Sequence, residues 1–227
     1  MCGIAGFVNR LGLAADRGIV ERMTATLSHR GPDGVGYYRD GPVALGHRRL
    51  SIIDVNGGAQ PMANEDGSIW VSYNGELYNE FELRRELEAK GHRYRTVSDT
   101  ESLVHLYEEE GLDFVRRLNG MFALSLWDRN LNRLVLARDR MGQKPLYYGR
   151  LPGGGLAFGS EPKAVLRHPE ISHDVLVAGR AARKPEVIEL IRSMGLHPID
   201  AGPIEVAGHL ERMTVLLLSI NKANKVK

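Results

Sequence analysis

The sequence predicts an α+β protein in which antiparallel β-sheets are covered by helices. Short apolar runs bounded by turn-forming residues, which are typical of strands, dominate the first 160 residues. Several of these runs follow one another directly as hairpins, and the helical stretches come in blocks. Alternating βαβ units would place a helix after each strand, so this order favours antiparallel sheets with helices on their faces.

Each predicted strand is an apolar run that ends at glycine, proline or a polar residue. Residues 69–73 alternate apolar and polar side chains and end at Asn74-Gly75, a dipeptide typical of hairpin turns. Two hairpins are predicted, around the connections 128–133 and 152–155. The predicted strands are residues 4–8, 35–39, 43–53, 69–73, 121–127, 134–137, 146–149 and 156–158.

Three helices are predicted in the same part of the chain, from capping residues and from apolar side chains at helical spacing. The first runs from residue 18 toward residue 27 and follows Asp16. The second covers residues 81–89 and follows Asn79. The third begins at Asp99 or Thr100 and ends at Gly111.

The pattern changes near residue 170. A buried-type strand at 174–179, a helix at 184–194, a short strand at 196–200 and a helix at 206–220 follow in turn. Because strand and helix alternate, this piece is predicted to be a small β-α-β-α unit of parallel type. The predicted domains are therefore residues 1–172 and residues 173–227.

The composition argues against several classes of function. The 227 residues carry a net charge of +2, and the basic residues are scattered, so no nucleic-acid groove is predicted. A single cysteine rules out an intrachain disulfide framework and fits a reducing compartment. There is no basic leader and no apolar run of about 20 residues, so we expect no membrane span and a cytoplasmic location.

The single cysteine is the second residue. If Met1 is removed, Cys2 carries both a thiol and a free α-amine, and α-amines titrate close to neutral pH. Such an amine can take the thiol proton, directly or through one water, which is the chemistry of an N-terminal nucleophile. The alternative is that Cys2 is an incidental small residue after the start.

Four polar clusters lie among the predicted strands, at residues 28–33, 46–52, 73–79 and 98–101. The first cluster, by itself, indicates a capped turn. In the second, Arg48 and Arg49 are adjacent in a strand and therefore point to opposite faces. An inward-facing guanidinium needs an anion and can bind a carboxylate in bidentate fashion. The alternative is an edge strand with basic side chains.

The third and fourth clusters offer complementary groups. The Asn74 amide and the Gly75 backbone N–H are good oxyanion donors, and a plain hairpin turn is the alternative. Asp99 can bind a substrate ammonium or cap a helix. A cationic fork, an anion, oxyanion donors and a thiol together describe a free α-amino acid with a side-chain amide, and L-glutamine is the obvious candidate.

Ordered motifs resemble one family over about residues 2–169. The chain is similar to the glutaminase domain of glutamine-hydrolysing asparagine synthetases, a class II glutamine amidotransferase. The motifs that carry this resemblance are Cys2-Gly3-Ile4, His29-Arg30-Gly31-Pro32-Asp33, Arg49-Leu50-Ser51-Ile52-Ile53-Asp54, Gly58-Ala59-Gln60-Pro61, Tyr73-Asn74-Gly75-Glu76-Leu77-Tyr78-Asn79, Ser98-Asp99-Thr100-Glu101, Asn119-Gly120-Met121-Phe122-Ala123, Ala137-Arg138-Asp139-Arg140, Lys144-Pro145-Leu146-Tyr147-Tyr148 and Phe158-Gly159-Ser160-Glu161.

The resemblance implies a role for each matching residue. Cys2, after loss of Met1, matches the nucleophile, and its own α-amine matches the general base. The Asn74 side chain and the Gly75 N–H match the oxyanion hole. The implied substrate-binding set is Arg49 for the glutamine carboxylate, Asp99 for its ammonium, Asn74, Gly75 and Glu76 nearby, and the adjoining Leu50, Ile52 and Ile53.

The resemblance also implies a fold and a reaction. The fold is a four-layer α-β-β-α sandwich of two antiparallel sheets, of the N-terminal nucleophile hydrolase type. Glutamine acylates Cys2, ammonia leaves, and the thioester is hydrolysed to glutamate, with no metal and no cofactor. The eight histidines show no ligand spacing, so they are predicted to be structural.

The chain departs from the family after residue 169. An asparagine synthetase continues into an ATP-pyrophosphatase domain that has a Ser-Gly-Gly-x-Asp-Ser loop, and no such loop occurs in these 227 residues. Any productive use of the ammonia would therefore need a separate synthetase chain as partner. A second copy of the chain, forming a homodimer, is the other partner considered.

Residues 173–215 are similar, more weakly, to the last part of the Rossmann domain of deazaflavin-dependent NADP reductases. Residues 179–182 lack the second and third glycines that phosphate approach requires, so this half-Rossmann piece is predicted not to bind a nucleotide. Two other functions stay open at this point. One is a non-catalytic glutamine-binding module, and the other is an oxidoreductase fragment that acts through the tail.

Overall fold

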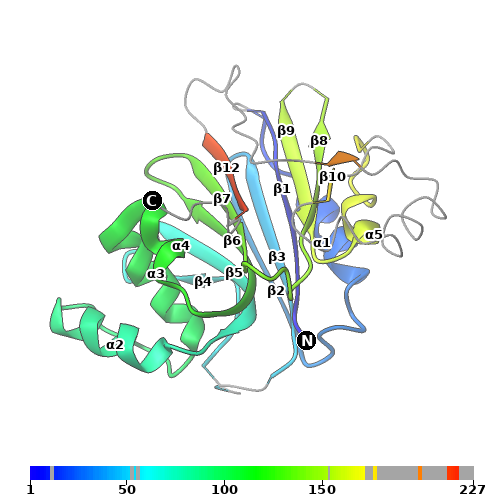
Figure 1. The fold of residues 1–227 in the computed structure, drawn as a ribbon. Helices are drawn as coiled ribbons and strands as arrows, with labels where there is room; N and C mark the ends of the chain where they lie inside the picture. Colours follow the sequence, from blue (N-terminus) through cyan, green and yellow to red (C-terminus); the bar gives the residue numbers. More distant parts are fainter. Residues whose placement is uncertain are drawn as a thin grey trace.

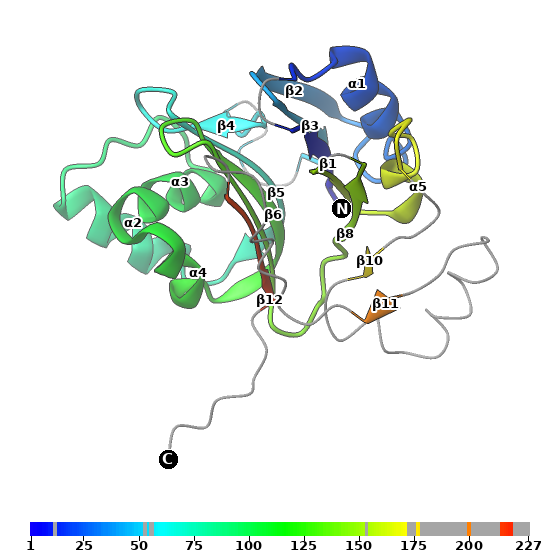
Figure 2. The same cartoon turned by 90° about the horizontal axis from the view of Figure 1, so that it is seen from above.

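The computed structural model of the chain contains two β-sheets packed face to face, with helices on both outer faces (Figure 1). It describes residues 1–10, 13–51, 54, 57–152, 154–171, 176–177, 199–200 and 214–219. The view from above shows the four layers edge-on (Figure 2). The predicted α-β-β-α sandwich is therefore confirmed. None of the helices in the described part of the chain is long and apolar enough to span a bilayer.

The first sheet contains β1, near the start of the chain, and β9, which ends at residue 159. Its strand order over the described residues is β11-β10-β8-β9-β1-β3-β2, and its pairs are antiparallel except β10 with β11. β1 lies between β3 and β9, so the start of the chain is held in the middle of this sheet. The strands are β1 (Gly3–Val8), β2 (Gly34–Asp40), β3 (Val43–Arg49), β8 (Tyr147–Leu151), β9 (Gly155–Gly159), β10 (Leu176–Val177) and β11 (Ile199–Asp200).

The second sheet has the order β12-β7-β6-β5-β4 over the described residues. β4, β5, β6 and β7 pair antiparallel with their neighbours, whereas β12 runs parallel to β7. Both predicted hairpins, β6–β7 here and β8–β9 in the first sheet, are confirmed. The strands are β4 (Met62–Ala63), β5 (Ile69–Leu77), β6 (Gly120–Asp128), β7 (Arg133–Arg138) and β12 (Thr214–Ser219).

The central core lies between the two sheets, and β1 shows how the sequence builds it. Successive side chains of a strand point to opposite faces. Ile4 and Val8 accordingly pack against Trp127 and other residues of the second sheet. Ala5 and Phe7 point to the other face and pack beneath helix α1. Both faces of β1 are buried, which explains why its sequence is apolar throughout.

Helices form the two outer layers (Figure 2). α1 (Arg17–Ala25) and α5 (Pro162–Val165) cover the first sheet through a cluster that includes Val20, Met23 and Val165. The second sheet is covered by α2 (Glu80–Ala89), α3 (Asp99–Glu110), the 3₁₀ turn Gly111–Asp113 and α4 (Phe114–Arg117). α3 is buried along most of its length against the second sheet, and this packing also fixes the position of its first turn.

The three helix starts differ in how well they were predicted. Asp16 caps α1, and its Oδ1 accepts a hydrogen bond from the Ile19 N–H at 3.2 Å, as predicted. Asn79 precedes α2 but makes no capping bond; its amide instead contacts the backbone near β6. α3 begins at Asp99, one of the two predicted starts, and its cap is Ser98, so the alternative that Asp99 caps the helix is wrong. The Asp99 carboxylate is therefore available for other partners.

Asn74-Gly75 does not form the predicted turn. β5 continues through this dipeptide to Leu77, and Gly75 pairs with Phe122 of β6. A Cβ on Gly75 would lie 2.3 Å from the Met121 carbonyl oxygen, so glycine is needed here for close approach of two backbones. The predicted strand 43–53 ends earlier than expected, at Arg49.

The described part of the tail is β-structure at both sheet edges. β10 pairs with β8, and β11 lies parallel to β10, which fits two of the predicted strands and their parallel direction. The predicted helix 184–194 lies outside the described residues. The predicted helix 206–220 is wrong for residues 214–219, which form β12 beside β7. The sequence pattern of a short apolar run is compatible with a buried strand or a buried helix. Here the run forms a strand, whose backbone pairs with that of β7.

Candidate active site

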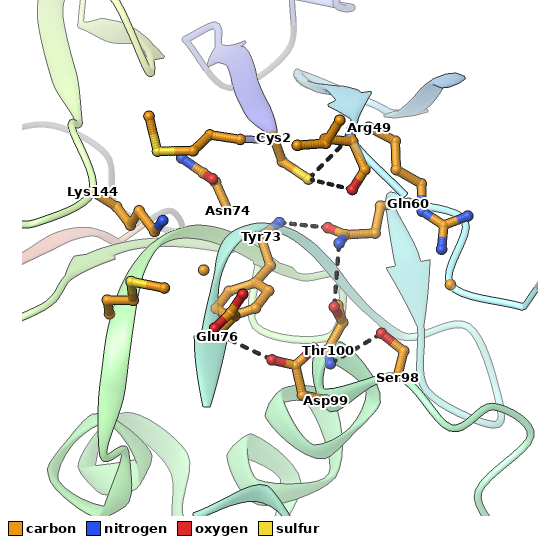
Figure 3. A pocket seen from close by; sticks show the side chains of 15 residues that line it. Cys2, Arg49, Gln60, Tyr73, Asn74, Glu76, Ser98, Asp99, Thr100 and Lys144 are labelled. Atoms are coloured by element: carbon orange, nitrogen blue, oxygen red, sulfur yellow. Dashed lines mark hydrogen bonds between the residues drawn. The ribbon is translucent and has the colours of Figure 1, made fainter. Parts of the chain in front are cut away.

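One cavity of about 250 Å³ contains every described residue of the predicted site (Figure 3). It opens where the starts of β1 and α3 approach the ends of β3 and β5. Ile52 and Ile53, also predicted to bind substrate, lie outside the described residues. The lining residues are Met1, Cys2, Arg49, Leu50, Gly58, Gln60, Tyr73, Asn74, Gly75, Glu76, Ser98, Asp99, Thr100, Met121 and Lys144.

Cys2 lies at the start of β1, partly exposed to the cavity. Its Sγ donates toward the Leu50 carbonyl oxygen at 3.7 Å and accepts from the Leu50 N–H at 3.4 Å. Leu50 directly follows β3, the strand that pairs with β1. The pairing of these two strands therefore sets the position of the thiol.

Arg30 holds the backbone of Cys2. Its Nε donates to the Cys2 carbonyl oxygen at 3.0 Å, and its Nη1 contacts Glu161 Oε1 at 3.0 Å. Burial raises the pKa of Glu161, but hydrogen bonds from Lys163, Arg30 and His29 outweigh it, so the net pKa is lowered and the carboxylate stays charged. Both Arg30 and Glu161 occur in the motifs noted in the sequence, but neither was assigned a role there.

The Met1 amine donates to the Arg30 carbonyl oxygen at 3.2 Å, and the Met1 side chain forms part of the cavity wall. Removal of Met1 would leave the Cys2 α-amine on the same carbon that bears the thiol side chain. Proton transfer from thiol to amine would then need only a short path, directly or through one water.

Asn74 is buried, and its side-chain amide nitrogen has no hydrogen-bond partner. An unpaired buried donor costs about 1–3 kcal/mol, so a protein retains one chiefly where a ligand completes it. Gly75 follows on the same strand and lines the same cavity. The cavity that contains the thiol therefore also contains an unpaired amide donor, and such donors can stabilise an oxyanion.

Asp99 is the first residue of α3, and its carboxylate points toward β5 (Figure 3). Its Oδ2 accepts from the Leu77 N–H at 3.0 Å and from the Tyr73 hydroxyl at 3.4 Å. Burial raises the pKa of Asp99. A cationic ligand group would favour the ionised form, so this carboxylate is suited to hold an ammonium.

Arg48 and Arg49 point to opposite faces of β3, as predicted. Arg48 donates toward the carbonyl oxygen of Thr24 on the α1 side at 3.4 Å. Arg49 lines the cavity and donates from Nη2 to the Asp54 carbonyl oxygen. Arg49 and Gln60 also line a neighbouring hollow of about 470 Å³. The guanidinium thus lies at the junction of the two hollows.

Several residues of the cavity were not predicted as site residues. The clearest is Gln60, whose Oε1 accepts from the Tyr73 N–H at 2.6 Å and whose Nε2 donates to Thr100 Oγ1 at 3.2 Å. These bonds join the segment before β4 to β5 and α3. Gln60 belongs to the Gly58-Ala59-Gln60-Pro61 motif, but the sequence does not show which groups its side chain will contact. Four other lining residues were also missed, because only the fold brings them to the cavity: Ser98, Thr100, Met121 and Lys144.

The described residues that could together hold a metal ion lie away from this cavity. They are Glu65, His92, His105 and Glu108, which gather beside α3. The sequence interpretation, which found no ligand spacing among the histidines, did not anticipate that His92 and His105 come together.

Comparison with solved structures shows which known fold the chain shares. Glutamine phosphoribosylpyrophosphate amidotransferase from B. subtilis, solved with ADP and GMP, matches 75% of this chain and 44% of its own with a TM-score of 0.63. The sequences are 24% identical, so this likeness concerns the fold. The chain therefore shares the fold of this amidotransferase.

The sequence comparison then gives the family. Residues 1–182 match the glutamine amidotransferase domain, and the chain belongs to that family. It is 47% identical to asparagine synthetase [glutamine-hydrolyzing] 3 of Bacillus subtilis (strain 168) over 75% of this chain, and 47% identical to the enzyme of Asparagus officinalis over 73%. In each case the match spans 28% of the relative's length. The chain therefore corresponds to the amidotransferase part of glutamine-hydrolysing asparagine synthetases.

Proposed function

We propose that this chain hydrolyses L-glutamine to glutamate and ammonia through a thioester on Cys2. The observation that carries this proposal is the unpaired, buried amide nitrogen of Asn74 in the cavity that also contains the Cys2 thiol. A donor without a partner has a use once an oxyanion forms beside it. The family and the names of the relatives support glutamine as the substrate.

The first half-reaction begins after Met1 has been removed. The Cys2 α-amine takes the thiol proton, and the thiolate attacks the side-chain carbonyl carbon of glutamine. The carbonyl oxygen becomes an oxyanion that the Asn74 amide and the Gly75 N–H stabilise. The ammonium form of the α-amine returns its proton to the leaving nitrogen, the C–N bond breaks, and ammonia and the thioester remain.

The second half-reaction restores the enzyme. The free α-amine takes a proton from a water molecule, which attacks the thioester carbonyl. The same two donors hold the second oxyanion, and the C–S bond breaks. Glutamate leaves, and the thiol and the amine are regenerated. These steps use groups of the chain, water and glutamine alone, and the absence of a cofactor stays a prediction.

The substrate is held at its amino-acid end by opposite charges. In this proposal Arg49 binds the α-carboxylate and Asp99 binds the α-ammonium, with Gly75 and Glu76 beside it. The two charged residues reach the cavity from different elements, the end of β3 and the start of α3 (Figure 3). Such a pair fixes the orientation of a free amino acid and leaves its side chain to extend toward Cys2.

The names of the relatives support one use for the ammonia. They are named asparagine synthetases, and this chain matches little more than a quarter of their length. We infer that ammonia passes to a separate synthetase chain, and we place both in the cytoplasm. A homodimer stays a prediction, as do the division at residue 172 and the reductase-like character of the tail.

The decisive experiment is a glutaminase assay on untagged protein whose N-terminus mass spectrometry shows to be Cys2. Release of glutamate and ammonia in equal amounts, abolished in Cys2→Ala, is the expected result. Glutamine binding without release of ammonia would contradict the proposal and would favour a non-catalytic glutamine-binding module. A rate that Cys2→Ala leaves unchanged would exclude the thioester.

A further inference from the structure

A cluster of histidine and glutamate side chains lies beside α3, away from the cavity that contains Cys2. Glu65 follows β4, and His92 follows α2. His105 and Glu108 are three residues apart on α3 and therefore share one helix face. One potential ligand atom from each of the four residues lies within 4.8 Å of the others.

The shorter distances in this cluster are close to those between the ligands of a tetrahedral metal ion. His105 Nδ1 is 3.2 Å from Glu108 Oε2 and 3.3 Å from Glu65 Oε2. His92 Nδ1 is 3.8 Å from the same Glu108 oxygen and 3.7 Å from Glu65 Oε1. Zinc bonds of about 2.0–2.1 Å in a tetrahedron separate ligand atoms by about 3.3–3.4 Å. With one ligand atom from each residue the cluster extends to 4.8 Å, so its most distant atoms would have to approach by about 1.4 Å to surround one ion.

The groups behind the cluster are arranged as supports for metal ligands. A metal-bound histidine commonly donates its other ring N–H to a carboxylate. His92 Nε2 contacts Glu109 Oε1 at 3.1 Å, and His105 Nε2 faces Glu101 Oε1 at 3.8 Å. Both imidazoles therefore direct Nδ1 into the cluster and Nε2 toward a carboxylate outside it.

The glutamates are also oriented. Glu108 Oε1 accepts from the Asn64 amide at 2.8 Å, which leaves Oε2 directed at the two histidines. Glu65 Oε1 accepts from the Arg93 N–H at 3.2 Å. Such contacts fix the direction of a carboxylate before a ligand binds and so lower the ordering cost of binding.

His105 is the most buried member of the cluster. Its side chain is 1% exposed, and its Nε2 has no hydrogen-bond partner. Its Nδ1 faces the Glu65 and Glu108 carboxylates inside the cluster, and its Nε2 faces Glu101 outside it. A ligand that binds Nδ1 would favour the neutral ring and orient its Nε2–H toward Glu101.

We propose that Glu65, His92, His105 and Glu108 bind a zinc ion. Imidazole and carboxylate are both good zinc ligands, and the two carboxylates neutralise a divalent cation. Four protein ligands leave no open position, so this is a structural site rather than a catalytic one. The carboxylates are partly exposed, which gives the ion a path from solvent.

The zinc ion would fasten the segment that leads into α3. Glu101, beside His105, accepts bonds from the Arg95 N–H at 2.8 Å and the Thr96 N–H at 2.7 Å. His92 begins this segment, and the helix cap Ser98 ends it. Zinc would thus join residues 92–98 to α3 and to the turn after β4. The proposal does not depend on the glutaminase reaction.

The test uses the full chain in a Cys2→Ala background, because a free thiol binds zinc by itself. After treatment with a chelator, the protein is titrated with Co²⁺ and then with Zn²⁺. We expect one tight equivalent, the visible absorption of tetrahedral Co²⁺ without a thiolate charge-transfer band, and displacement by Zn²⁺. X-ray absorption on the zinc form should show nitrogen and oxygen ligands that include two imidazoles.

Variants then locate the site. Glu108→Gln and His92→Gln should each abolish the tight equivalent, and Glu109→Gln should weaken it by about tenfold or more through His92. Glu88→Gln, the same charge change at an exposed position of α2, should leave binding unchanged. Circular dichroism and thermal unfolding without metal show that each variant is folded.

Two outcomes would overturn the proposal. One is the absence of any tight equivalent in the chelator-treated Cys2→Ala protein, which would mark the cluster as an ion-pair network around protonated histidine. The other is equal binding by the folded Glu108→Gln and His92→Gln variants, which would place the metal elsewhere, for instance on other histidines. Zinc should also raise the unfolding temperature of the Cys2→Ala protein but not of these two variants.

Discussion

Arg30 donates a hydrogen bond from Nε to the carbonyl oxygen of Cys2 at 3.0 Å. The same guanidinium contacts Glu161, and its side chain is almost fully buried. The residue that bears the thiol is therefore held from behind by a fixed cation that does not itself line the cavity. Arg30 is thus a positioning residue, because it acts on the reaction through the backbone of Cys2.

Arg30→Lys should lower kcat by up to about 10²-fold and leave KM nearly unchanged, since a displaced nucleophile affects the chemical step more than binding. An ammonium cannot hold the Cys2 carbonyl and the Glu161 carboxylate with the fixed geometry of a guanidinium. Steady-state kinetics on protein with a free Cys2 amine measure both constants.

His29→Gln is the matched control. His29 contacts the same Glu161 oxygen at 2.9 Å, its side chain is half exposed, and within the described part of the chain it makes no hydrogen bond to Cys2. This variant should keep kcat. If Arg30→Lys lowered only the unfolding temperature and kept kcat, the positioning role would be excluded.

The two adjacent arginines of β3 offer another comparison. Arg49→Lys should raise KM for glutamine about tenfold or more, because a point charge replaces a bidentate fork and at least one charge-assisted hydrogen bond is lost. Arg48→Lys changes the same residue type on the opposite face, toward Thr24, and should leave KM unchanged. Equal effects of the two substitutions, or none, would remove Arg49 from the substrate site.

Asn74→Ala should reduce kcat about 10²–10³-fold, the usual loss when one oxyanion donor is removed. Asn74→Asp is a closer match in shape but replaces the donor by a negative charge, so its kcat should fall at least as far. Neither variant loses a protein hydrogen bond from the amide nitrogen, because that atom has none. A large loss of folding stability together with a fall in kcat below tenfold would instead indicate a structural role.

Sequence reasoning succeeded where local signals decide the structure. The hairpins β6–β7 and β8–β9 and the Asp16 cap depend on residues close together in the chain. It failed at Asn74-Gly75, because the same dipeptide serves a turn or a close approach of two strands, and only the partner strand distinguishes them. The apolar run in residues 214–219 is ambiguous in the same way.

The candidate site shows the same division. Residue types and motif order brought Cys2, Arg49, Asn74 and Asp99 into one predicted pocket, and the structure places all four in one cavity. The bridge made by Gln60 and the cluster around His105 join segments that are distant in the chain. Neither has a fixed spacing in the sequence, so only the fold could reveal them.

Blocking the chain's first amine provides a direct test of the general base. Protein that retains Met1, or carries an N-terminal tag, should lose glutaminase activity, because the Cys2 nitrogen is then an amide that cannot accept a proton. A tag placed at the C-terminus is the control and should have little effect. Full activity of the N-terminally tagged protein would show that another group takes the thiol proton.

Asp99 connects substrate binding with stability. Burial raises the pKa of its carboxyl, although the bond from the Leu77 N–H partly counteracts this effect. In free enzyme, kcat/KM should fall as pH drops through this raised pKa, because a protonated Asp99 no longer attracts the glutamine ammonium. Asp99→Asn should remove this limb of the pH profile and lower kcat/KM at neutral pH.

The raised pKa of Asp99 affects folding in the opposite direction, because ionisation of this carboxyl favours substrate binding but lowers the stability of the fold. A carboxyl with a raised folded-state pKa holds its proton more tightly than the unfolded chain does, so stability is lost as pH rises from the unfolded pKa through the folded one. Asp99→Asn does not titrate, and its amide oxygen can still accept from the Leu77 N–H. We therefore expect this variant to unfold at a higher temperature than the parent at neutral pH while binding glutamine more weakly. A variant that is less stable and equally active would show that Asp99 serves the helix start rather than the substrate.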